Sequence, residues 1–153
     1  MKIVLAEDEF LQEQLITETI KESFVTAEII TVQSERGFRS RIPEFEREPP
    51  SVFLLDVMLT WDYAQSEIEV APSDVLGKAA RAGIRCAELI RSNEKLRSVP
   101  VILFTVLDRQ DIDADLRRLT PLKVMYVVKE SGYQTLVEEL RKIFRQPTLP
   151  PRS

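Results

Sequence analysis

Five short apolar runs, each followed by a stretch in which apolar residues have helical spacing, constrain the fold of this chain more than any other feature. The runs occupy residues 2–7, 28–32, 52–56, 99–105 and 123–129. Strands that are apolar throughout are typical of a parallel sheet, which is buried on both faces. With a helix after each strand and right-handed crossovers, this order predicts an α/β fold: a doubly wound, five-stranded parallel sheet with helices on both faces.

The segments between the runs predict the helices. One covers Phe10 to Phe24, and the last, from Tyr133 to Phe144, has apolar residues three and four positions apart. A shorter helix is expected to cover only Ser34 to Arg41, because Pro43 does not fit the interior of a helix and the pair Pro49-Pro50 marks a stop.

Length and composition fit a single domain. The chain has 153 residues, of which 44% are hydrophobic and 30% are charged. We expect the domain to cover residues 1–146 and a flexible, proline-rich tail to cover residues 147–153. The domain carries a long insertion at about residues 60–82, within which Ser73 is a suitable N-cap for a helix that continues to Ile90.

Several classes of function are excluded by what the chain lacks. Without histidine it has no imidazole base, no His-ligated zinc and no phosphohistidine of its own. The single Cys86 cannot form an internal disulfide, and we expect it to be a small buried hydrophobe. A net charge of −4 argues against direct nucleic-acid binding. With no long apolar segment or signal peptide, we expect no membrane insertion and a cytoplasmic location.

Reactive side chains stand at the ends of four of the five runs: Glu7, Asp8, Asp56, Thr105 and Lys129. In a parallel sheet of this kind, ligands bind beyond the carboxyl ends of the strands, where these residues are expected to meet. Carboxylates at about 4 Å repel one another by roughly 4 kcal/mol per pair at an effective dielectric near 20, so a cation is needed. Oxygen ligands without His or Cys favour Mg²⁺.

This constellation resembles the receiver domain of response regulators in two-component signal transduction. The resemblance rests on the acidic pair in LAEDE, the Asp of FLLDVML, the Thr of VILFT and the Lys of YVVKE, each at the expected strand end. It spans nearly the whole chain and implies a flavodoxin-like sheet with strand order 2-1-3-4-5.

The resemblance implies that Asp56 accepts a phosphoryl group from a phosphohistidine on a sensor histidine kinase or phosphorelay protein. Asp8, Asp56 and the backbone carbonyl of Met58 would bind Mg²⁺ directly, and Glu7 would act through a coordinated water. Such a chain is a phosphoacceptor switch and not an enzyme with a separate substrate.

The same resemblance assigns roles to three further residues. Lys129 and Thr105 would each contact an oxygen of the phosphoryl group. Thr105 and Tyr126 would form a switch in which the threonine moves toward the phosphate and the aromatic ring turns inward. The altered surface would bind a downstream protein target. It is also a possible homodimer interface, formed by the polar helix with Ile112 and Leu116, the fifth strand and the last helix.

The chain departs from the family in several places. Glu130 and Thr60 stand where prolines are customary; a cis bond before Glu130 would cost about 2.5–4 kcal/mol, so we expect a trans bond or strain. From Asp56 to Gly83 there are 83 − 56 = 27 positions, far more than is usual. Apolar Met58 and Leu107 stand where polar residues could contact an attacking water, which predicts slow self-dephosphorylation.

Structural alternatives remain for each assignment. Asp56 could cap a loop, Glu7 and Asp8 could be solvated acids that favour the dipole of the following helix, and Lys129 could be a surface lysine. Thr105 could be a helix N-cap, and Tyr126 could simply pack in the core. The insertion, with Trp61, Tyr63, Glu67 and Glu69, could select the kinase, cover the site or be a tolerated surface loop.

Two other functions compete with a phosphorylated receiver. DVMLT partly fits the first motif of haloacid-dehalogenase-type phosphatases, but Met58 replaces the second aspartate, which makes such a hydrolase improbable. The alternative that remains is a receiver-like interaction module that works without phosphorylation. A receiver that stands alone, as we expect here, must act through another protein.

Overall fold

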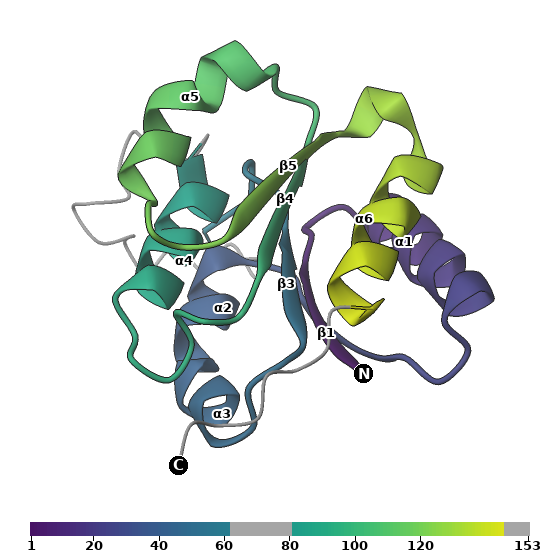
Figure 1. The fold of residues 1–153 in the computed structure, drawn as a ribbon, viewed down its shortest axis with the longest axis horizontal. Helices are drawn as coiled ribbons and strands as arrows, with labels where there is room; N and C mark the ends of the chain where they lie inside the picture. Colours follow the sequence, from purple (N-terminus) through teal and green to yellow (C-terminus); the bar gives the residue numbers. More distant parts are fainter. Residues whose placement is uncertain (62–80, 146–153) are drawn as a thin grey trace.

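The computed structural model describes residues 1–61 and 81–145, and its centre is one parallel β-sheet (Figure 1). The strand order is β2-β1-β3-β4-β5, and every neighbouring pair is parallel. The strands are β1 Lys2–Ala6, β2 Glu28–Val32, β3 Val52–Leu55, β4 Val101–Thr105 and β5 Val124–Val128. The α/β class and the strand order 2-1-3-4-5 are therefore confirmed.

Helices cover both faces of the sheet (Figure 1). On one face lie α1 Phe10–Ser23 and α6 Tyr133–Arg145, whose apolar sides pack on a core that includes Ile16, Ile20, Leu136 and Leu140. The other face carries α2 Glu35–Ser40, α3 Ile42–Arg47, α4 Ala82–Arg91 and α5 Arg109–Arg118. Strand β3 is fully buried between the two layers, which explains why it is apolar at every position.

The prediction that helical structure stops at Arg41 is wrong. A separate helix, α3, begins at Ile42 and contains Pro43 in its first turn. Proline is tolerated there because the first amides of a helix have no acceptor within the helix and the ring fixes a helical φ. Phe45 of α3 is fully buried, with its ring centroid 5.6 Å from those of Phe38 and Phe53.

Other boundaries differ by a few residues. Strand β4 begins at Val101 instead of position 99, and Glu7, Asp56 and Lys129 lie just beyond strands that were expected to include them. Cys86 is buried in α4 as expected, and burial raises the pKa of its thiol.

Residues 62–80 and 146–153 lie outside the described residues, and with them Ser73, most of the insertion and the tail at 147–153. The described residues on either side of this gap are in contact, because the amide of Gly83 in α4 donates to the carbonyl of Val57 at 2.9 Å. A Cβ atom at Gly83 would lie 2.2 Å from the backbone oxygen of Asp56, so α4 approaches this loop as closely as only glycine allows. Within the described part of the chain, no helix has both the length and the apolar character needed to cross a bilayer.

Candidate functional site

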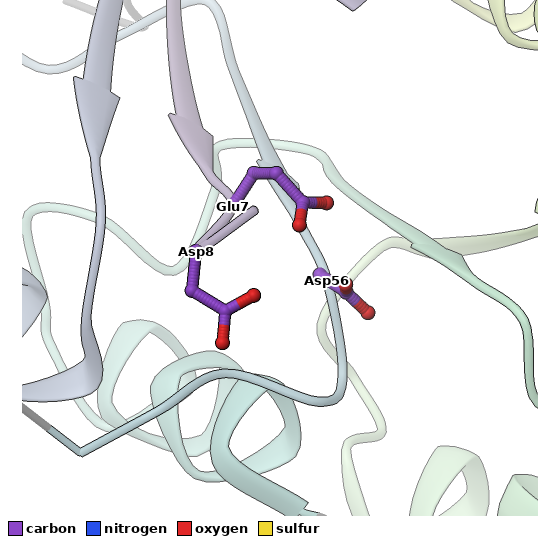
Figure 2. A group of neighbouring side chains, drawn as sticks. All are labelled: Glu7, Asp8 and Asp56. Atoms are coloured by element: carbon purple, nitrogen blue, oxygen red, sulfur yellow. The ribbon is translucent and has the colours of Figure 1, made fainter. Parts of the chain in front are cut away.

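Three carboxylates meet at the carboxyl ends of β1 and β3, which are neighbours in the sheet. Ala6 pairs with Leu55 at the last register position, so the residues that follow the two strands emerge side by side. Glu7, Asp8 and Asp56 each place a carboxylate oxygen within 4.8 Å of the others, and their side chains converge on one space (Figure 2). The sequence prediction that these acids meet is correct.

Lys129 joins this acidic cluster from the end of β5. Its Nζ donates to Glu7 Oε2 at 2.8 Å and to Asp56 Oδ2 at 3.0 Å. The lysine side chain is only 12% exposed, and its Nζ also lies 5.8 Å from the ring centroid of Phe104. We call Glu7, Asp8, Asp56 and Lys129 the acidic pocket; with three carboxylates and one ammonium, it has an excess of negative charge.

Burial and charge shift the pKa values in this pocket. Burial raises the pKa of Glu7 from 4.5 to about 7, and the negative charge of Asp56 adds to the rise, although the hydrogen bond from Lys129 opposes it. Burial alone would lower the pKa of Lys129, but the charge of Asp56 and the contacts with Glu7 outweigh it and raise that pKa. The ammonium therefore stays charged, while protons compete for Glu7 near neutral pH.

Backbone amides orient the carboxylates. The amide of Met58 donates to Asp56 Oδ1 at 3.2 Å, and the amide of Thr60 donates to Asp8 Oδ2 at 2.9 Å. Glu7 Oε1 accepts from the amide of Glu9 at 3.1 Å. The roles of the amides of Met58 and Thr60 could not be predicted from the sequence, because nearly every residue type carries a backbone donor. A proline customary at position 60 but absent here was the one available signal.

The two residues predicted to form a switch, Thr105 and Tyr126, are linked through one turn. Thr105 ends β4 with no exposed surface, and its Oγ1 accepts from the amide of Leu107 at 3.3 Å. The hydroxyl of Tyr126, in β5, donates to the carbonyl of Leu107. Thr105 and Tyr126 therefore both bond to the turn that leads into α5. The motion expected of them stays a prediction.

Several expected features have partial answers. The Lys129–Glu130 bond is not cis, since the cis bond found in residues 1–61 and 81–145 is Thr120–Pro121. Met58 is 43% exposed, and the role of its carbonyl stays a prediction. Trp61 lies beneath Arg39, whose guanidinium is 5.4 Å from the ring centroid, whereas Tyr63, Glu67 and Glu69 lie outside the described residues.

A second group of buried charges was not expected. The carboxylate of Glu35, at the start of α2, has no exposed surface. It accepts from Arg85 of α4 at 2.8 and 2.6 Å and from Arg39 at 2.9 Å. We call Glu35, Arg39 and Arg85 the arginine network; it joins α2 to α4 on the face of the sheet beside the loop that follows Asp56.

Comparisons with known proteins bear on the fold. No protein-family model matches the chain, and no curated protein matches it in sequence. Among solved structures, the phosphorylated cyanobacterial phytochrome response regulator RcpA is 22% identical, with 97% of each chain covered and a TM-score of 0.68. The Mn²⁺-bound form of response regulator Rcp1 is 23% identical, over 97% of this chain and 98% of that one, with a TM-score of 0.63.

A third similar structure is a signal receiver domain from Clostridium thermocellum. It is 16% identical, covers 94% of this chain and 97% of its own, and has a TM-score of 0.68. All three are response regulators or receiver domains, and each is matched over nearly its whole length. The chain therefore has the fold of response regulator receiver domains.

Proposed function

We propose that this chain is a receiver that accepts a phosphoryl group on Asp56 from a sensor histidine kinase or phosphorelay protein. The observation that carries the proposal is the charge of the acidic pocket, where three converging carboxylates share one ammonium. Asp56 is only 8% exposed, so this excess charge is poorly solvated. An arrangement of this kind is stabilised by a divalent cation, whose charge in turn favours the binding of phosphoryl oxygens beside it.

The donor set fits Mg²⁺. Carboxylate oxygens with no nitrogen or sulfur donor suit a hard cation that keeps several waters. Asp8 and Asp56 would hold the ion with the carbonyl of Met58, and Glu7 would act through a coordinated water. When bound, the ion supplies positive charge against which phosphoryl oxygens can collect.

Asp56 is oriented as a nucleophile by its neighbours. The amide of Met58 holds Oδ1, and Lys129 holds Oδ2. In the transfer, an oxygen of the Asp56 carboxylate forms a bond to phosphorus as the phosphorus–nitrogen bond of the donor's phosphohistidine breaks. The electron pair of that bond stays on the histidine nitrogen, and the imidazole leaves neutral because its other nitrogen carries a proton. Lys129 and Thr105 would then each contact a phosphoryl oxygen.

Exposed apolar side chains lie on segments that lead away from the strand ends at the pocket, and they suit a docking protein. Phe10 and Leu11 open α1 and are each 63% exposed, and Val106, which follows Thr105, is 55% exposed. Together with Met58, they belong to the segments that directly follow β1, β3 and β4. Residues of this kind are enriched in protein interfaces. We assign this surface to the kinase or phosphorelay partner, in a cytoplasmic setting.

The output would pass through the turn at Leu107. Because Thr105 and Tyr126 both bond to this residue, a movement of the threonine toward the phosphoryl group would disturb the tyrosine and the start of α5. A downstream protein, or a second copy of the chain, would then bind the face formed by α5, β5 and α6. Apolar Met58 and Leu107 predict a slow loss of the phosphoryl group.

The test is phosphorylation by acetyl phosphate with Mg²⁺, followed by intact mass spectrometry. We expect one phosphoryl group on the native chain, none on Asp56→Asn, and one on Asp113→Asn, a matched control in which the acid lies on α5. If the native chain is not phosphorylated by acetyl phosphate or by any candidate kinase, a phosphorylation-independent interaction module is the better account.

A further inference from the structure

We infer that Thr60 is a positioning residue for the cation site, acting through its backbone amide on Asp8. The inference rests on the proposed function, because Asp8 is one of the carboxylates assigned to the cation. Thr60 N lies 2.9 Å from Asp8 Oδ2, although 52 positions separate the two residues. A hydrogen bond to an ionised carboxylate is among the stronger ones in proteins.

This contact depends on the residue that departs from the resembled family. A proline at position 60 has no amide hydrogen and could not donate to Asp8. The side chain of Thr60 is not required for the bond, since any residue except proline supplies the donor. A threonine in place of the customary proline therefore adds a hydrogen bond to Asp8, one of the residues proposed to bind the cation directly.

The start of α2 fixes the position of Thr60. The first amides of a helix lack acceptors within the helix. Here the amide of Glu35 donates to the carbonyl of Thr60 and the amide of Arg36 to the carbonyl of Trp61, both at 2.9 Å. Ser34 completes this end of the helix, because its hydroxyl accepts from the amide of Gly37 at 2.9 Å. The loop is thus held on one side by α2 and contacts Asp8 on the other.

The arginine network holds the start of α2 in place. The same Glu35 whose amide holds Thr60 has its carboxylate fully buried and bonded to Arg85 of α4. Two residues before Arg85, Gly83 packs against the backbone of Asp56. The helices α2 and α4 therefore hold both ends of the segment from Asp56 to Thr60. These contacts direct the amide of Thr60 at Asp8, although no proline ring restricts the backbone at position 60.

Loss of this amide hydrogen is expected to weaken cation binding. Groups that orient metal ligands by hydrogen bonds typically contribute about 10- to 100-fold to metal affinity. We expect Thr60→Pro to bind Mg²⁺ at least about tenfold more weakly, because Asp8 is no longer held in place before the ion arrives. Thr60→Ala keeps the amide and is expected to bind like the native chain.

The test measures the dissociation constant of Mg²⁺ by titration calorimetry in the native chain, Thr60→Pro and Thr60→Ala. A third variant carries the α-hydroxy analogue of threonine at position 60, so that an ester replaces the amide and an oxygen atom replaces the N–H donor. This variant guards against a proline that perturbs folding. We expect the proline and ester variants to lose affinity together, while the alanine variant does not.

Asp8→Ala provides the second readout, which requires no cation. In that background the ester should no longer destabilise the protein toward denaturant, because its hydrogen-bond partner is gone. The inference is overturned if the ester variant binds Mg²⁺ as tightly as the native chain, if Thr60→Ala weakens binding as much as the ester, or if the ester destabilises the Asp8→Ala protein as much as the native one. A native chain that binds no Mg²⁺ would instead contradict the proposed function.

Discussion

The acidic pocket and the arginine network both bury carboxylates beside cations, yet their charges are balanced in opposite ways. In the pocket, Glu7, Asp8 and Asp56 share the ammonium of Lys129, which leaves an excess of negative charge. In the network, two guanidinium groups serve the single carboxylate of Glu35.

This difference in charge balance suggests a binding role for the acidic pocket and a structural role for the arginine network. A carboxylate with two arginines has its oxygens satisfied by the protein and needs no ligand, so its value is structural. Three carboxylates that compete for one lysine are stabilised further by a cation or a proton from solution. The charge balance of the acidic pocket therefore supports the proposal that it binds a cation, whereas that of the arginine network suits a contact that holds α2 and α4 together.

The largest effect is expected for Glu35→Gln. The substitution keeps the shape of the side chain but removes the negative charge that faces Arg39 and Arg85, and breaking a buried ion pair in this way costs about 3–5 kcal/mol. Urea denaturation should show a loss of about 3 kcal/mol in the free energy of unfolding. A loss below about 1 kcal/mol, the value typical of surface pairs, would mean that the network is not a support.

A smaller loss is expected for Gly83→Ala, which tests whether α4 holds the loop after Asp56. The added Cβ would lie 2.2 Å from the carbonyl oxygen of Asp56 and 2.6 Å from Cα of Val57, so the backbone must shift. We expect a cost of about 2 kcal/mol, as for overpacked cores, measured by the same denaturation. Gly37→Ala, on α2, is the control, because its Cβ would approach only side-chain atoms, at 3.0 Å or more. Equal losses for the two would argue against a special role for Gly83.

Asp8→Asn is expected to act in the opposite direction. Removing one of the three mutually repelling charges should raise the free energy of unfolding by about 1 kcal/mol in the presence of a chelator. The amide oxygen of asparagine can still accept from Thr60, so the gain reports mainly on charge. A loss of stability in this variant would show that the pocket carries no excess of negative charge.

The last effect is gradual: the free energy of unfolding is expected to change with pH because of Glu7. In the folded protein the pKa of Glu7 is raised from 4.5 to about 7. The protonated side chain therefore contributes to the free energy of unfolding fully below about pH 4.5, and this contribution is lost as pH rises through 7. Without divalent cations, the native chain should therefore lose stability over this range relative to Glu7→Gln. Thermal unfolding of both proteins between pH 4.5 and 7.5 measures the difference. Parallel curves would place the pKa of Glu7 near its ordinary value.

The sequence predicted the sheet and the acidic pocket because both follow from local pattern. Apolar runs define buried strands, and charged residues at the ends of parallel strands must emerge at one edge, as Glu7 and Asp56 do. Helix α3 was not predicted because Pro43 does not fit the interior of a helix, although a first turn accepts proline.

The arginine network could not be read from pattern. Glu35 and Arg85 are 50 positions apart, and neither belongs to a motif. The amide of Thr60 was equally hidden, since backbone donors are common to all residues except proline. Long-range contacts between single polar groups depend on how α2 and α4 pack, and only the three-dimensional structure gives that arrangement.

Binding of a divalent cation in the acidic pocket is tested most directly by X-ray diffraction from crystals soaked in Mn²⁺, with data collected to reveal anomalous scattering from the ion. We expect one strong peak in the anomalous difference map, bounded by the carboxylates of Asp8 and Asp56, and we expect it to be lost in crystals of Asp8→Asn. A peak elsewhere, or none at saturating Mn²⁺ with Glu7, Asp8 and Asp56 placed as in Figure 2, would contradict the claim that this pocket binds a divalent cation.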